Sequence, residues 1–199
     1  MPDSHRNPEP RDRFVRRMSH GPLVMRNAAA TLLCLAVSGC GDKGPTEPDP
    51  VTLPDLFGNQ LYRSDGSQVG VGTLEGTSII GIYFASPTCP ACLAFSPLLV
   101  DAYNQLKTDG RSFEVVLVVN GINVASLSDF MTDSGMPWLA VSPESGRPSA
   151  LAQRFSVQWV PTLIIIDGTG KIISLAGRDE ITQNGPGAYD DWIAAGPGG

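Results

Sequence analysis

The chain has 199 residues, of which 42% are hydrophobic and 17% are charged. This length suits one domain with additional terminal segments. Residues 1–39 hold 6 of the 14 basic and 3 of the 20 acidic side chains, so the remainder carries 8 basic against 17 acidic groups, a net charge of −9. A nucleic-acid partner is therefore disfavoured, because binding to the phosphate backbone depends on clustered positive charge.

The segment that begins at Met25 has the pattern of a signal peptide. Arg26 supplies the positive charge, and residues 28–37 form an apolar stretch that is too short to span a bilayer alone. The stretch ends in Val37-Ser38-Gly39-Cys40, which resembles the lipobox of bacterial lipoproteins. The resemblance implies that Cys40 is lipidated and becomes the first residue of the mature protein. Two alternatives are an ordinary cleavage site and an uncleaved membrane anchor, and either would still export the domain.

Three segments follow from this pattern. Residues 1–39 are read as a leader with its signal peptide, and residues 40–52 as a lipidated tether. The prolines and charges of the tether cannot build a core and favour an extended chain. Residues 53–199 form the predicted domain, which opens with a hairpin of residues 60–63 and 68–71 around a glycine-containing turn.

Two cysteines stand between a predicted buried strand and a predicted helix. The apolar run of residues 79–84 predicts the strand, Cys89 and Cys92 follow it, and the helical pattern begins at Leu93. The positive end of a helix favours a thiolate, so Cys89 is the expected nucleophile. The spacing places Cys92 one turn further on, where it can resolve a mixed disulfide on Cys89. The pattern predicts dithiol chemistry.

Two other uses of the cysteine pair are a metal site and a static disulfide. Zinc needs about four ligands. His5 and His20 both lie in the leader, so residues 41–199 contain no histidine. A structural disulfide between Cys89 and Cys92 would close almost no loop and would stabilise the fold little. Neither a metal nor another cofactor is expected.

Further elements follow in chain order. The helix after the cysteines contains Pro97 and ends near residue 109, and residues 113–119 suit a parallel strand joined to the first by a right-handed crossover. One apolar face of that helix is predicted from Phe95, Leu98, Leu99, Ala102, Tyr103 and Leu106. Downstream we expect short helices over 123–134, capped by Ser126 or Ser128, over 148–155 and over 189–193, with a hairpin of residues 163–166 and 172–175.

Four segments in order carry a resemblance to a known family. Residues 83–92, 113–118, 136–141 and 160–164 resemble the thioredoxin superfamily, most closely its tryparedoxin and nucleoredoxin branch, and the similarity covers residues 54–193. It implies an α/β thioredoxin fold with three layers, α/β/α, a central mixed sheet and an N-terminal hairpin.

The resemblance also assigns the site. Cys89 would attack a disulfide and Cys92 would displace the product, while Pro161 would be a cis proline facing Cys89. Val160 would offer its backbone groups to an extended substrate. Thr88, where these proteins usually have tryptophan, is the third residue expected to contact substrate.

Other positions depart from the family pattern or leave two readings open. Tyr83 replaces the buried aspartate of many thioredoxins, so Cys92 is expected to lose its proton through water, and Leu93 replaces a basic residue. Arg178 either follows the Gly-Arg pattern of the tryparedoxin branch or is a solvated charge. Trp138 either lies beside the active-site region or fills the core.

The predicted function is an exported, lipid-anchored thiol–disulfide oxidoreductase that reduces or isomerises protein disulfides. It would lie on the extracytoplasmic side of a bacterial membrane, and a reductase there needs a membrane electron donor. One alternative is a thiol peroxidase, although no basic residue is near Cys89 in sequence to stabilise the leaving oxygen. Another is a non-catalytic module that binds peptides or captures Cu(I) through two thiolates.

Overall fold

The computed structural model describes residues 51–196. The leader, the signal peptide, Cys40 and the tether up to residue 50 lie outside the described residues. Within residues 51–196 no helix is both long and apolar enough to cross a bilayer.

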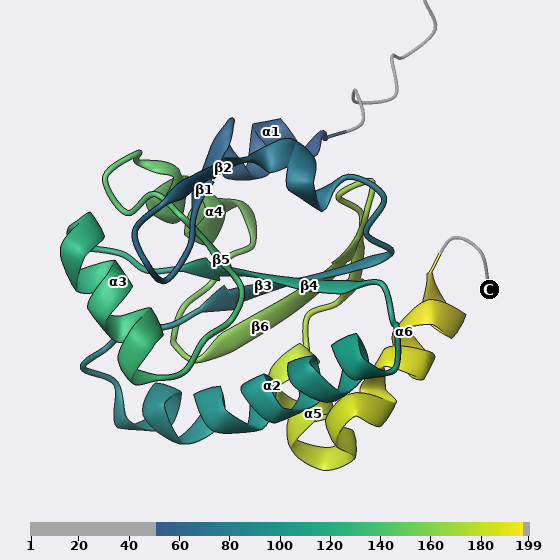
Figure 1. The fold of residues 1–199 in the computed structure, drawn as a ribbon. Coiled ribbons are helices and arrows are strands. Elements are labelled where there is room, and N and C mark those ends of the chain that lie inside the picture. The colour runs from purple at the N-terminus through teal and green to yellow at the C-terminus, as the bar shows by residue number, and fades with distance from the viewer. Residues whose placement is uncertain (1–50, 197–199) are drawn as a thin grey trace, which may run out of the picture. The chain divides into compact units, whose positions relative to one another are not determined.

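The centre of the structure is a seven-stranded mixed sheet with the strand order β2-β1-β5-β4-β3-β6-β7 (Figure 1). Strands β3, β4 and β5 run parallel to one another. On one side β6 is antiparallel to β3 and β7 is antiparallel to β6. On the other side β1 is antiparallel to β5 and β2 is antiparallel to β1. The strands span Gln60–Tyr62 (β1), Gln68–Gly70 (β2), Ile79–Phe84 (β3), Phe113–Val118 (β4), Leu139–Val141 (β5), Thr162–Asp167 (β6) and Ile172–Ser174 (β7).

Strand β3 is central because apolar residues fill both of its faces, and all six are buried. It pairs in parallel with β4 over its full length and antiparallel with β6, where Phe84 lies opposite Thr162. A Cβ at Gly81 would lie 3.0 Å from the Leu163 side chain, so glycine permits the close packing there. The register brings the loop after β3 and the loop before β6 to the same end of the sheet.

Helices cover both faces of the sheet and complete three layers. Residues of α2, α3, α5 and α6 pack in one core, and those of α1, η1 and α4 pack in the other. Figure 1 shows α2, α5 and α6 below the sheet and α1 and α4 above it. The helices span Leu53–Phe57 (α1), Val71–Leu74 (η1, 3-10), Pro90–Thr108 (α2), Val124–Asp133 (α3), Arg147–Arg154 (α4), Gly177–Asn184 (α5), Gly185–Gly187 (η2, 3-10) and Ala188–Ala195 (α6). The predicted thioredoxin fold is confirmed.

The structure corrects several local expectations. Helix α2 begins at Pro90, three residues before Leu93, because Cys89 already serves as its N-cap. Leu98 is 46% exposed and does not belong to the core that the rest of the predicted apolar face of α2 forms. Asn123, rather than Ser126 or Ser128, caps α3 through its side-chain oxygen, which accepts the Ser126 N–H at 2.8 Å.

Candidate active site

The loop between β3 and α2 places Cys89 at the N-cap of the helix, directly before its first residue. Ala85 remains tied to the sheet, because its N–H donates to the Val118 carbonyl at 3.2 Å, and a turn from Ser86 to Cys89 follows. Cys89 has extended backbone angles, and its sulfur accepts the Cys92 N–H at 3.2 Å. Pro90 suits the first helical position, where a missing N–H costs nothing. An N–H directed at the sulfur favours negative charge on it.

The two thiols differ in exposure. Both are free cysteines, but Cys89 is partly exposed whereas Cys92 is fully buried, at 0%. A substrate disulfide can therefore reach the first sulfur and not the second. The attacking role of Cys89 and the resolving role of Cys92 stay predictions, to which this difference in exposure is suited.

The second loop at this end of the sheet brings Val160 and Pro161 beside the cysteines. The bond between these two residues is cis, as the resemblance implies. The Cys89 thiol donates to the Val160 carbonyl oxygen, with 3.6 Å between the two atoms. Thr162 fixes the start of β6, because its hydroxyl donates to the Trp159 carbonyl at 2.8 Å. Four of the predicted site residues, Cys89, Cys92, Val160 and Pro161, thus lie together.

Thr88 lies next to Cys89 in sequence and is exposed. Its hydroxyl oxygen lies 3.1 Å from that of Ser86, and its N–H donates to the same Ser86 hydroxyl at 3.4 Å. These contacts hold the Thr88 hydroxyl within its own loop. Thr88 therefore borders the site, and its hydroxyl bonds to Ser86 instead of to the Cys89 sulfur.

Burial controls the protonation of Cys92. Loss of solvent raises the pKa of the Cys92 thiol to about 12, and its hydrogen-bond interaction with Cys89 adds to the shift. The Ser86 backbone and the Arg178 guanidinium oppose this rise in pKa more weakly. The resolving thiol is thus strongly held in its protonated form in the reduced protein.

Two hydroxyl groups occupy the region behind Cys92. Ser96 donates to the Cys92 carbonyl at 2.9 Å, and the Tyr83 oxygen lies 2.9 Å from that of Ser96. Burial raises the pKa of Tyr83, so its phenol does not act as a base near neutral pH. In the described part of the chain the buried carboxylate is Asp167, which lies opposite Ile79 at the other end of β3. The Tyr83 site thus carries a neutral hydroxyl pair in place of an acid.

Trp138 belongs to the core and also supports this hydroxyl pair. Its side chain is 1% exposed, and its ring meets that of Tyr83 edge-on, with 6.3 Å between the centroids. It makes a similar contact with Tyr103 at 5.6 Å. Both readings of this residue are thus partly right, because Trp138 packs in the core directly behind the cysteine region.

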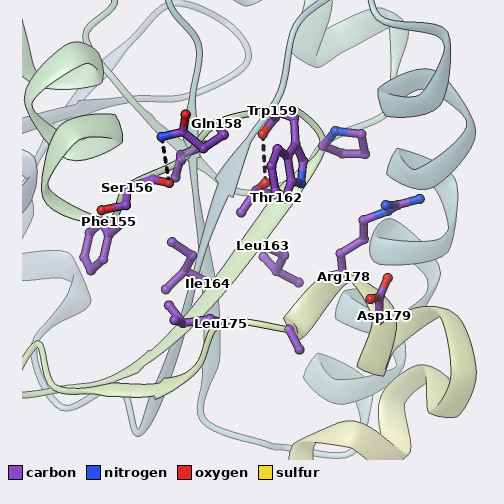
Figure 2. A pocket seen from close by; sticks show the side chains of 13 residues that line it. Phe155, Ser156, Gln158, Trp159, Thr162, Leu163, Ile164, Leu175, Arg178 and Asp179 are labelled. Atoms are coloured by element: carbon purple, nitrogen blue, oxygen red, sulfur yellow. Dashed lines mark hydrogen bonds between the residues drawn. The ribbon is translucent and has the colours of Figure 1, made fainter.

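A cavity of 380 Å³ opens next to Pro161, between the loop before β6 and the start of α5 (Figure 2). Arg178 lines it, so the fold brings a positive charge into the region of the cysteines from a distant part of the sequence. Trp159, which sequence reasoning missed, also lines the cavity. Its one sequence signal is its place two residues before Pro161. No group of three or more potential metal ligands occurs within residues 51–196.

Comparisons with known proteins agree with this geometry. Residues 76–172 match a family model described as thioredoxin-like. Nucleoredoxin of Bos taurus is 33% identical over 165 residues, which are 82% of this chain but 36% of that protein, so the chain spans about a third of its length. Tryparedoxin from Trypanosoma brucei is 32% identical with a TM-score of 0.58, over 72% of this chain and 93% of that one. Thioredoxin related protein 16 of Carcinoscorpius rotundicauda is 31% identical with a TM-score of 0.61, and the match covers 69% of this chain and 96% of that protein's chain.

Proposed function

Because the chain belongs to the thioredoxin superfamily, in its tryparedoxin and nucleoredoxin branch, we propose that it is a thiol–disulfide oxidoreductase acting through Cys89 and Cys92. The observation that carries this proposal is the placement of Cys89. Cys89 is a partly exposed residue, and its sulfur receives the Cys92 N–H at 3.2 Å and lies 3.6 Å from the Val160 carbonyl.

The reaction proceeds in two exchanges. The Cys89 thiolate attacks one sulfur of a substrate disulfide, forms a mixed disulfide with it and releases the other sulfur as a thiolate. The Cys92 thiol then loses its proton, and its thiolate attacks the Cys89 sulfur and releases the remaining substrate thiolate. Two electrons pass to the substrate, and the protein is left with a disulfide between Cys89 and Cys92. The substrate thiolates take up protons from water and from Cys92.

Backbone groups of Val160 and the nearby Thr88 would orient the substrate. The Val160 carbonyl already lies at hydrogen-bond distance from Cys89, so an extended segment bound there would have its cysteine next to the nucleophile. Pro161 shapes this edge, and Thr88 is the exposed residue directly before Cys89. Substrates are proteins that contain disulfides or dithiols.

We favour a reductase or an isomerase over a strong oxidant. Strong oxidants of this fold stabilise the first thiolate unusually well, which makes their reduced form favourable. The Cys89 sulfur here has one N–H donor, from Cys92, and one acceptor, the Val160 carbonyl. The Thr88 hydroxyl, which could have added a second donor, bonds to Ser86. A working reductase must then receive electrons from a donor.

The location proposed for this reaction is the extracytoplasmic side of a bacterial membrane. Its support is the sequence pattern of residues 25–40, and residues 40–52 would act as the tether that carries the lipid on Cys40. A protein that reduces disulfides there cannot draw on cytoplasmic thiols directly, so a membrane-embedded donor would recharge it.

The test combines turnover with a redox equilibrium. The full chain should accelerate reduction of insulin disulfides by dithiothreitol, and Cys89→Ala should not. Equilibration in glutathione buffers then gives the potential of the dithiol, which we expect to be well below about −120 mV, the value of a strongly oxidising relative. A potential near that value would overturn the reductase assignment. Turnover at the background rate would overturn the enzymatic role and favour a binding module.

A further inference from the structure

Two arginines of α4 line a cavity between this helix and the start of α1. The cavity has a volume of 340 Å³, and Arg147 and Arg154 contribute to it together with Val51 and Asp55. The two arginines stand at the first and last positions of α4, about two turns apart, so they lie on the same face of the helix. Residues 51–196 contain 7 basic against 14 acidic side chains, so a cavity with two arginines is unusual in this negatively charged domain.

One carboxylate belongs to the lining of the same cavity, that of Asp55 in α1. Its oxygen Oδ2 accepts the N–H of Thr52 at 3.0 Å and the Thr52 hydroxyl at 2.6 Å, as part of the cap of α1. These bonds hold the pKa of Asp55 below its usual value, and the charges of Arg147 and Arg154 act more weakly in the same direction. The carboxylate is therefore committed to α1, and two positive charges face one negative charge.

The two guanidinium groups differ in how firmly they are held. Arg147 is partly buried and donates to the backbone carbonyl of Asp55, whereas Arg154 is exposed. Within residues 51–196 neither arginine forms an ion pair. Leu56 and Leu151 supply the buried, apolar part of the lining. The cavity therefore offers one fixed and one exposed guanidinium, and guanidinium groups match the oxygens of a phosphate in both charge and geometry.

The cavity lies where the proposed tether joins the domain. Val51, the first residue that the structure describes, is itself part of the lining. The chain from Cys40 to Val51 can extend over at most about 40 Å, so a lipid on Cys40 would keep Val51 within that distance of the membrane surface. A tether this short gives the face around Val51 a high effective concentration at the lipid headgroups.

We propose that Arg147 and Arg154 form a docking surface for the phosphate groups of anionic phospholipids in the membrane that carries the anchor. This inference rests on the location proposed above and extends it, because it states which face of the domain turns toward the bilayer. Each basic side chain near an anionic membrane raises the binding constant about fivefold. Asp55 offsets one of the two contributions, which leaves a net gain of about fivefold. The acidic remainder of the domain is repelled by the same membrane, so the arginine face is the one that docks.

Docking on this face does not cover the cysteines. Leu56 and Leu151 belong to the core that α1 and α4 form on one face of the sheet, whereas Cys89 and Cys92 pack with the core on the other face. Figure 1 shows α1 and α4 above the sheet and α2, which begins directly after Cys89, below it. A docked domain thus keeps the sheet between its contacts with the headgroups and the core that holds the dithiol.

Selective modification of arginine tests the surface. The full chain is purified from bacterial membranes and reconstituted in vesicles of phosphatidylcholine, alone or with an equal share of phosphatidylglycerol. Hydroxyphenylglyoxal then modifies accessible guanidinium groups, and mass spectrometry gives the rate for each arginine. We expect phosphatidylglycerol to slow the modification of Arg147 and Arg154 by about twofold to fivefold and to leave Arg63, an exposed arginine directly after β1, unchanged. High salt should remove the protection, because it screens the charges.

Two substitutions show whether the arginine pair causes the protection. Arg154→Gln should abolish the protection of Arg147, because Asp55 then offsets the remaining positive charge. Arg154 is exposed, so this change should leave the fold intact. Arg63→Gln, the matched control, removes the same charge outside the cavity and should leave both cavity arginines protected. An Arg154→Gln protein in which Arg147 keeps its full protection would overturn the docking surface.

Vesicle flotation distinguishes failure of the docking surface from failure of the proposed location, because anchoring through Cys40 does not depend on the arginines. A chain that floats with both kinds of vesicle but shows equal modification of Arg147 and Arg154 in both would overturn the docking surface alone. That result is expected if the acidic tether residues Glu47 and Asp49 occupied the cavity instead of lipid. A chain that floats with neither kind of vesicle would contradict the location and the docking surface together.

Discussion

The Cys89 sulfur lies 3.6 Å from the carbonyl oxygen of Val160, a residue 71 positions later in the chain. The sheet register creates this contact, because Phe84 at the end of β3 pairs with Thr162 at the start of β6. One loop therefore brings the nucleophile and the other brings the backbone group beside it. The site depends on the pairing of two strands and not on either segment alone.

The hydroxyl pair behind Cys92 should contribute measurably to stability. Ser96→Ala removes the donor to the Cys92 carbonyl and leaves the buried Tyr83 hydroxyl with only a long 3.4 Å contact to that carbonyl. We expect a loss of about 1–3 kcal/mol in the free energy of unfolding, because a buried polar group loses its partner. Urea denaturation measures the loss.

A double-mutant cycle tests whether the two hydroxyls act together. Tyr83→Phe removes both hydroxyl contacts of that ring, so in its presence Ser96→Ala should cost clearly less than it does alone. The difference should be at least about 0.5 kcal/mol. Strict additivity of the two losses would contradict the interaction between Tyr83 and Ser96.

The second exchange should depend steeply on pH. Burial raises the pKa of Cys92, and this cause persists when Cys89 is held in a mixed disulfide, so the Cys92 thiolate fraction should increase about tenfold per pH unit throughout the range below its pKa. A mixed disulfide of Cys89 with thionitrobenzoate allows the step to be followed by release of the coloured thiolate. We expect the rate to rise without a plateau between about pH 6 and 9. A plateau below pH 8 would show that Cys92 ionises in the usual range of a thiol.

The cap of α3 provides a test of local structure with a built-in control. Asn123→Ala should lower the free energy of unfolding by about 1 kcal/mol, because its side chain accepts the Ser126 N–H at 2.8 Å. Ser126→Ala changes an exposed hydroxyl that does not cap the helix and should alter stability by less than about 0.5 kcal/mol. The reverse order of the two effects would contradict the assigned cap.

Local features of the fold differ in how well the sequence predicts them. The uniform apolar character of residues 79–84 and the spacing of Cys89 and Cys92 were sufficient to predict a buried strand leading into a dithiol helix. The same periodic reading failed at Leu98, because the spacing of apolar residues alone does not show whether each of them faces the core. Asn123 and the nearby serines are similarly good caps, so composition could not choose among them.

Long-range relationships were harder to predict. The place of Val160 and Pro161 beside Cys89 came from the resemblance, because no local pattern links two segments so distant in sequence. Arg178 is absent from the sequence neighbourhood of the cysteines and reaches their region only through the packing of α5. Trp159 has the sequence character of another apolar residue before a strand, and neither its 71% exposure nor its place beside two cavities can be read from the sequence.

Anchoring can be tested separately from catalysis. If Val37-Ser38-Gly39-Cys40 is a lipobox, Cys40→Ser should abolish lipidation and the accompanying cleavage, since both require that thiol. We expect the mutant to lose its lipid and to move from the detergent phase to the aqueous phase in detergent partitioning. A mutant that partitions as the unaltered protein does would indicate that residues 28–37 act as an uncleaved anchor.

The central claim is that Cys89 attacks and Cys92 resolves, and trapping the intermediate tests it most directly. The full chain carrying Cys92→Ala is mixed with a disulfide-bonded protein, alkylated and mapped by mass spectrometry, beside Cys89→Ala as the control. The account predicts a persistent mixed disulfide on Cys89 in Cys92→Ala and no adduct in Cys89→Ala, because Cys92 is fully buried. A substrate adduct on Cys92 in the Cys89→Ala protein, or none on Cys89 in the Cys92→Ala protein, would contradict it.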